Sequence, residues 1–195
     1  MKNSLHSIIR LLKKEEIARR YFIMNSFDGA LTVFGIIIAL YLSGIESTKI
    51  VVASCAGAAI SLGVSGIWSG YASERAERIK KLKTLERHLM RDLSKTKVGL
   101  KTRTMTVLVA LVNGISPTLV AVIIITPFIA SNLGFFSIQT AYKASILLVA
   151  LILFSLGAIV GGIAQEKILP NAVKMLLAGV VVAGVSILLE YFKVI

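Results

Sequence analysis

Long stretches without charged side chains constrain this chain more than any other feature. A helix needs about 20 consecutive apolar residues to cross a bilayer. Asp28 is the single charged residue of 21–45, and no charge occurs in 50–73, 104–142, 144–165 or 175–189. Charged residues make up 16% of the chain, against about 25% in a typical soluble domain. The sequence therefore predicts an integral membrane protein. It excludes a soluble enzyme, and also a β-barrel, whose strands would alternate.

We predict an all-α, polytopic fold in a single membrane domain covering 1–195. Its five transmembrane helices are expected at 21–43, 50–71, 104–130, 144–164 and 172–190. The third apolar run is long enough to suggest two spans, but Asn132-Leu133-Gly134 interrupts it and leaves too few residues afterwards. Apolar residues gather on one face of 1–20, which predicts an amphipathic interfacial helix. Residues 72–103 are predicted to form a basic cytoplasmic helical segment.

The positive charges predict the orientation. Of the 22 Lys and Arg, six lie in 1–20, eleven in 72–103 and two in 166–174. Five spans place these three segments on one side, and an excess of Lys and Arg marks the cytoplasmic side. We therefore expect a cytoplasmic N-terminus. The absence of a visible targeting motif favours the cell membrane of a prokaryote.

Asp28 is the ionisable residue that stands well inside a predicted span. It lies roughly 10 Å along the first span, at ~1.5 Å per residue. An ionised carboxylate at that depth is costly unless it is paired, hydrated or bound to a metal. Asn25 shares its helical face, and Met24 lies one turn earlier. We predict a transport or metal-binding role for Asp28, Asn25 and Met24. The alternative is that Asp28 only hydrogen-bonds a neighbouring helix.

A second polar element lies in the third predicted span, where residues 113–117 read Asn-Gly-Ile-Ser-Pro. Pro117 has no N–H and frees a carbonyl one turn earlier. Asn113 and freed carbonyls are plausible cation ligands, with Gly114 and Pro117 as a hinge. A kink without any other role explains the same residues equally well.

The cytoplasmic end of the second span carries two carboxylates three residues apart. Glu74 and Glu77 share a helical face and could receive a cation from the cytosol. Arg75 and Arg78 stand beside them, which favours a salt-bridged surface instead. The basic residues expected to face anionic lipid head groups are Arg78, Lys80, Lys81 and Lys83. No aromatic side chains interleave with them as nucleic-acid binding would require, so we expect no nucleic-acid partner.

The sequence offers no catalytic constellation. His6 and His88 have no Cys partners, and neither a phosphate-binding glycine loop nor a nucleophile elbow is present. We expect no enzyme activity and no permanently bound cofactor.

Several segments, taken in order, resemble the vacuolar iron transporter (VIT) family of five-span divalent-metal transporters. The first span, with Asp28-Gly29, looks like the family's opening helix. Residues 56–77 resemble its small-residue second span, and NGISPTLVAVIIITPF (113–128) its proline-containing third span. The last two spans share its glycine-rich character. The resemblance implies a homodimer with the transport path near the two-fold axis, where the two copies of Asp28 could share a proton or a divalent cation.

The chain departs from the family's pattern in two places. Members that carry iron usually have a glutamate and methionines in the second span, where this chain has Leu62, Gly66 and Gly70. Their cytoplasmic segment is longer and rich in glutamate, whereas 72–103 is short and basic.

The expected function is a secondary transporter that exports a divalent metal cation, Fe²⁺ or Mn²⁺, from the cytoplasm in exchange for protons. The metal is thus a transported substrate, and membrane lipids are the expected surroundings. One alternative is a transporter of another ion. The other is a non-transporting membrane scaffold that binds lipid or a partner through 72–103.

Overall fold

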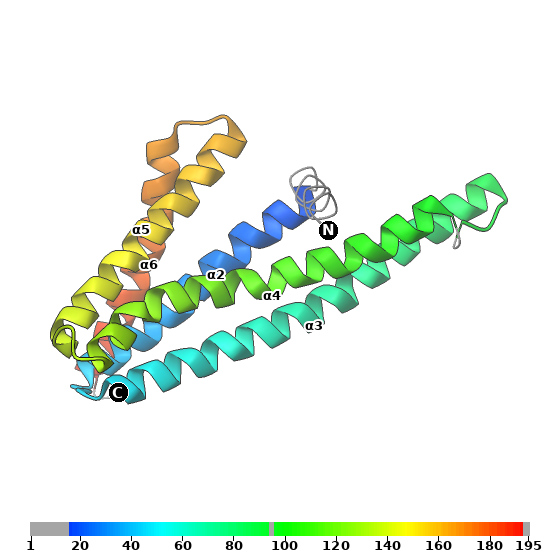
Figure 1. Ribbon diagram of the computed structural model, residues 1–195. Helices are drawn as coiled ribbons and strands as arrows, with labels where there is room; N and C mark the ends of the chain where they lie inside the picture. Colours follow the sequence, from blue (N-terminus) through cyan, green and yellow to red (C-terminus); the bar gives the residue numbers. More distant parts are fainter. Residues whose placement is uncertain (1–15, 94–95, 193–195) are drawn as a thin grey trace. The chain divides into compact units, whose positions relative to one another are not determined.

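The protein is described here from a computed structural model, which describes residues 16–93 and 96–192. Every regular element in this part of the chain is an α-helix (Figure 1). The helices are α2 (Glu16–Leu42), α3 (Thr48–Leu89), α4 (Lys97–Asn132), α5 (Ile138–Ala164) and α6 (Ile168–Tyr191). All five are long and apolar enough to cross a membrane. The predicted all-α class with five spanning helices is therefore confirmed. Most of the amphipathic helix predicted for 1–20 lies outside the described residues.

Two helices extend well beyond their apolar runs. α3 continues from the second span through the basic segment to Leu89, and α4 already begins at Lys97. Ala, Glu, Lys, Arg and Leu dominate this extension and are good helix formers, so nothing in the sequence ends the helix where the apolar run ends. The end comes at Met90, whose backbone is left-handed (φ 49°), a conformation typical of helix termini. Teal and green ribbons show the two extensions side by side in Figure 1.

The chain divides into two compact units. One comprises Met1–Phe22 and Gly63–Ser116, and the other Ile23–Leu62 and Pro117–Ile195. α3 and α4 each contribute to both units.

The second unit holds the main apolar core. Buried side chains from α2, α3, α4 and α5 form it, including Val33, Ile37, Val51, Ile124 and Phe128. In lipid, interhelical association depends on close packing and on polar side chains that bond across helices.

Three hydroxyl groups in this unit connect separate elements: two join one helix to another, and that of Tyr142 joins α5 to the turn between α2 and α3. Tyr142 Oη donates to the Ile45 carbonyl at 2.9 Å, and Ser145 Oγ to Ile124 O at 2.9 Å. Thr118 Oγ1 donates to Ala59 O at 3.2 Å. In these three contacts a backbone carbonyl accepts the hydrogen bond, whereas Thr48 Oγ1 of α3 donates to the side-chain Oδ1 of Asn132 at the end of α4, at 3.2 Å.

α5 and α6 form a tight antiparallel hairpin. A Cβ on Gly157 would lie 2.5 Å from Ala172 Cα, and one on Gly161 would lie 3.0 Å from Ile168 Cα. The two glycines therefore let the helix backbones approach each other, as the GxxxG spacing indicates. The turn after α5 is made by Gln165 in the left-handed conformation (φ 57°).

Candidate transport site

Asp28 lies on the exposed side of α2 in the second unit. The adjacent face of the helix is packed: Gly29 is buried, and a Cβ there would lie 2.7 Å from Pro117 Cα. α2 therefore meets α4 at the proline, one residue beyond Asp28. Asn25 is half-buried and Met24 is 53% exposed. The three predicted residues share a short stretch of α2, and the Asp28 carboxylate faces away from the apolar core of the second unit.

Ser26 is a polar residue that the sequence reasoning did not single out. It is fully buried, and its Oγ has no hydrogen-bond partner among the described residues. The sequence does not reveal such an unpartnered hydroxyl group, because a serine in an apolar helix normally hydrogen-bonds to a carbonyl of its own helix. Ser26 thus places a hydroxyl group close to Asp28 in sequence.

Asn113 and Gly114 lie in the first unit, where α4 crosses α3. Asn113 is buried, and its Nδ2 donates to Gly66 O at 2.6 Å. A Cβ on Gly66 would lie 2.9 Å from the Asn113 carbonyl oxygen, and one on Gly70 would lie 2.7 Å from Asn113 Nδ2. Gly114 packs against Gly63 and Ile67. We call this contact of Gly63, Gly66 and Gly70 with Asn113 and Gly114 the glycine crossing.

The glycine crossing bears on the prediction that Asn113 and its freed carbonyl are cation ligands. The carbonyl that loses its helical partner at a proline is the one four residues earlier, which for Pro117 is that of Asn113. That oxygen lies against α3, and the side-chain amide already holds Gly66. α4 continues as one helix through both Pro117 and Pro127, and Ser116 Oγ donates to Val112 O within it. A ligand role for Asn113 and a hinge at Gly114 and Pro117 stay predictions.

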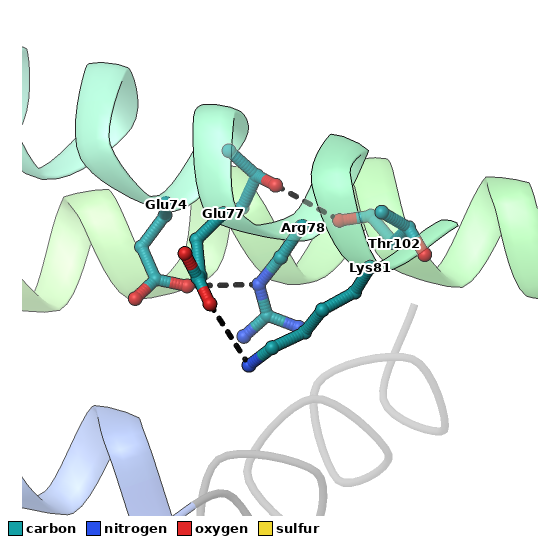
Figure 2. A network of polar contacts seen from close by, with 6 residues as sticks. Glu74, Glu77, Arg78, Lys81 and Thr102 are labelled. Atoms are coloured by element: carbon teal, nitrogen blue, oxygen red, sulfur yellow. Dashed lines mark hydrogen bonds and ion pairs between the residues drawn. The ribbon is translucent and has the colours of Figure 1, made fainter. Parts of the chain in front are cut away.

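Glu74 and Glu77 each form an ion pair with the base four residues onward (Figure 2). Arg78 Nε lies 2.9 Å from Glu74 Oε2, and Lys81 Nζ lies 3.6 Å from Glu77 Oε1. The first pair is largely buried, with side chains 15% and 8% exposed, and the second is open to solvent. Arg75, which the sequence placed beside these carboxylates, is not their partner, because residues four apart on a helix face each other and adjacent ones do not.

The four basic residues predicted to face lipid head groups differ in their exposure. Lys80, Lys81 and Lys83 are exposed. Arg78 is directed instead to Glu74, and its guanidinium is mostly buried. Within the described part of the chain, no three His, Cys, Asp or Glu side chains gather as a metal cluster.

Comparison with known proteins identifies the family. The sequence model of the VIT family matches residues 70–191. An uncharacterised protein of Methanocaldococcus jannaschii is 31% identical over 193 residues, which cover 96% of this chain and 95% of the relative. The chain belongs to the VIT family. With its five apolar helices, this membership indicates an integral membrane transporter of metal ions.

In this VIT protein the matched segment begins within α3, so it includes the glycine crossing from Gly70 onward and the two ion pairs of Figure 2. Asp28 lies before it. The role assigned to Asp28 therefore depends on its chemistry and its position in α2, and less on the family match.

Proposed function

We propose that this VIT protein is a secondary transporter that exports Fe²⁺ or Mn²⁺ from the cytoplasm in exchange for protons. The observation that carries the proposal is the position of Asp28, a carboxylate inside an apolar helix and turned away from the core of its own unit. Ionisable groups within a span are costly and are found mainly where ions or protons pass. Membership in a family of metal transporters supplies the class of substrate.

A carboxylate is suited to exchange because it binds either a proton or a metal ion. Asp28 would release its proton when the cation binds from the cytoplasm and would take up a proton after the cation leaves. An exposed carboxylate in a span needs a partner surface that excludes lipid. A second copy of the chain, related by a two-fold axis, would cover this face and bring the two Asp28 side chains together. The homodimer is therefore part of the proposal.

The cytoplasmic end supplies the access to this site. Orientation follows the basic segments, so the N-terminus and the α3–α4 extension would be cytoplasmic, in the cell membrane of a prokaryote. Glu77 would be the first carboxylate available to a cation, because its pair with Lys81 is exposed and such pairs are weak. Glu74 would be less available, since its pair is buried. Neither nucleic acid nor a permanently bound cofactor enters the proposed cycle.

Transport by reconstituted protein tests the proposal. Proteoliposomes that contain a metal-sensitive dye are exposed to Fe²⁺ or Mn²⁺, with a pH dye reporting proton movement in the opposite direction. We expect Asp28→Asn to abolish both signals. Thr32→Val is the matched control, because it removes a polar group one turn further along the same exposed side of α2 and should retain transport. Undiminished metal transport by Asp28→Asn would refute the role of the carboxylate.

A second candidate, transport of a different ion, is favoured by the glycine crossing. Asn113 occupies the space beside Gly66 and Gly70, so α3 offers no side-chain ligand there. The same vesicles decide between the candidates: a panel of Mg²⁺, Co²⁺, Ni²⁺ and Zn²⁺ should give little signal next to Fe²⁺ and Mn²⁺ if the first proposal holds.

A further inference from the structure

Two adjoining cavities lie along α3 and α4 in the first unit, and three residues, Tyr71, Arg75 and Val107, line both. The cavity nearer the apolar run has a volume of ≈ 520 Å³, and the one nearer the basic segment ≈ 370 Å³. Each falls within the range of about 300–1,000 Å³ that small-molecule sites occupy. Together they form one continuous groove, which we call the α3–α4 groove.

The chemistry of the α3–α4 groove changes along its length. Its apolar end is lined by Ile67, Trp68 and Leu111 among other apolar residues. Its polar end is lined by Arg75, Arg103, Thr102 and Thr106, with Ile79 and Leu82. An apolar channel that ends at two cations matches a molecule with a hydrocarbon chain and a negatively charged head.

The arginines of the groove carry charge that the described part of the protein does not neutralise. Each glutamate of α3 is engaged elsewhere: Glu74 with Arg78, Glu77 with Lys81, and Glu86 as acceptor for the Leu93 N–H at 2.9 Å. Neither Arg75 nor Arg103 has a carboxylate partner among the described residues, and both are exposed. Their guanidinium groups are thus available to a phosphate, to which arginine can donate two parallel hydrogen bonds.

The threonines refine the type of head group. Thr102 Oγ1 donates to Val98 O at 2.9 Å, and Thr106 Oγ1 donates to Thr102 O at 3.0 Å. With their protons used in this way, both hydroxyl oxygens can still accept hydrogen bonds. They suit the hydroxyl groups of a glycerol head, while the arginines suit its phosphate.

The position of the groove agrees with a membrane surface. Trp68 and Tyr71 lie near the end of the uncharged run of α3, which Glu74 and Arg75 follow, and Arg103 directly precedes the uncharged run of α4. Trp68 is 79% exposed. Trp and Tyr concentrate where hydrocarbon gives way to head groups, so the change from apolar to basic lining falls at the depth of the lipid phosphates.

We propose that the α3–α4 groove is a binding site for one anionic phospholipid, with an acyl chain beside Trp68 and the head group on Arg75 and Arg103. This differs from a general attraction of the basic segment to the membrane, in which Lys80, Lys81 and Lys83 would contribute as much as the arginines. It also does not depend on Asp28 or on the transported ion.

Trp68 provides the test, because it is the chain's only tryptophan. The purified chain is reconstituted in vesicles of equal parts phosphatidylglycerol and phosphatidylcholine, with bromine, which quenches tryptophan fluorescence, on the chains of one lipid or the other. We expect brominated phosphatidylglycerol to quench Trp68 more strongly, with a preference on the order of tenfold, since each nearby basic residue favours anionic lipid. Arg75→Gln/Arg103→Gln should lose most of this preference.

The matched control is Lys80→Gln/Lys83→Gln, which removes the same charge from exposed positions outside the groove lining and should keep the preference. Arg75→Lys/Arg103→Lys should retain part of it, which separates lost charge from misfolding. Equal loss in both glutamine pairs would overturn the proposal in favour of general charge. Loss of the preference on adding inorganic phosphate would mean that the groove binds a free anion instead. If neither brominated lipid quenches Trp68, another surface covers the groove and the proposal fails.

Discussion

The glycine crossing gives the sharpest stability prediction, and Gly66→Ala is the variant that tests it. The added Cβ would stand 2.9 Å from both the Asn113 carbonyl oxygen and Gly114 Cα. Both are backbone atoms, so no side chain can rotate away. Ordinary contact begins at 3.4 Å, and the two helices must therefore separate by roughly 0.5–1 Å.

The magnitude follows from three contributions. Overpacking of this kind costs about 1–3 kcal/mol. Separation also stretches the hydrogen bond from Asn113 to Gly66, and interhelical bonds in membranes are worth about 0.6 kcal/mol on average. Alanine recovers about 1 kcal/mol of helix propensity over glycine. The variant should therefore lose about 1–2.5 kcal/mol of stability.

Gly57→Ala is the matched control, because Gly57 lies in the same helix and a Cβ there meets nothing within 4 Å. It should be neutral or gain up to about 1 kcal/mol from helix propensity. Thermal unfolding in detergent can be followed with a thiol-reactive dye, since Cys55 is buried and is the only cysteine. We expect Gly66→Ala to unfold about 2–14 °C below Gly57→Ala, because the two variants differ by about 1–3.5 kcal/mol and each kcal/mol shifts the unfolding temperature of a chain of this length by about 2–4 °C. Equal unfolding temperatures would show that α3 and α4 do not approach this closely.

Three further substitutions address other contacts. Glu74→Gln should cost about 1–3 kcal/mol because it leaves the mostly buried, positively charged side chain of Arg78 without a carboxylate partner. Glu77→Gln should cost no more than about 0.5 kcal/mol, and a comparison of the two unfolding temperatures checks this. Tyr142→Phe should cost about 1 kcal/mol by removing the hydrogen bond from α5 to the turn between α2 and α3, measured in the same way. Gly157→Ala should separate α5 from α6 and lower the unfolding temperature. Gly162→Ala should leave the unfolding temperature unchanged or raise it, because a Cβ on Gly162 meets nothing within 4 Å. Equal effects of the two substitutions would contradict the close contact at Gly157.

The five helices could be predicted from the sequence because bilayer thickness and backbone hydrogen bonding leave few other solutions for long apolar runs. The ends of the helices could not. The apolar run that predicts the second span ends near residue 71, and a helical segment is predicted for 72–103. That this segment continues α3 without a break to Leu89 and then ends at Met90 is not predicted. Hydropathy identifies the residues that lie within the bilayer. It does not predict where a helix ends, because helix length depends on the helix propensity of the following residues and on the residue that terminates the helix.

Sequence periodicity does not determine which face of α3 packs against α4. A series of small residues at spacings of three and four includes Ser61, Ser65 and Ser69, and its spacing suits close helix contact. The structure leaves these serines exposed and uses Gly66 and Gly70 instead. Both series have the right period, so only the position of α4 decides between them.

The candidate site was predicted in part. Asp28 stood out because charge is rare in a span, a signal that needs no partner to be recognised. Arg75 did not stand out, because it lies among many bases and next to glutamates. Which base pairs with which carboxylate depends on helix geometry, and the i, i+4 pairs of Glu74 and Glu77 leave Arg75 for the α3–α4 groove. The groove itself needs two helices and is not visible in either alone.

The glycine crossing also connects helix packing with the choice of ion. The family resemblance implies second-span ligands in iron-carrying members, where this chain has Leu62, Gly66 and Gly70. A carboxylate introduced at Gly70 would meet the Asn113 side chain, since even a Cβ there lies 2.7 Å from Nδ2. Gly70→Glu alone should therefore disrupt the crossing and create no metal site, and space for a ligand requires a smaller residue at Asn113 as well. The missing ligands and the close helix contact thus have one structural cause, and under the proposed function Asp28 on α2 would be the residue that binds the cation.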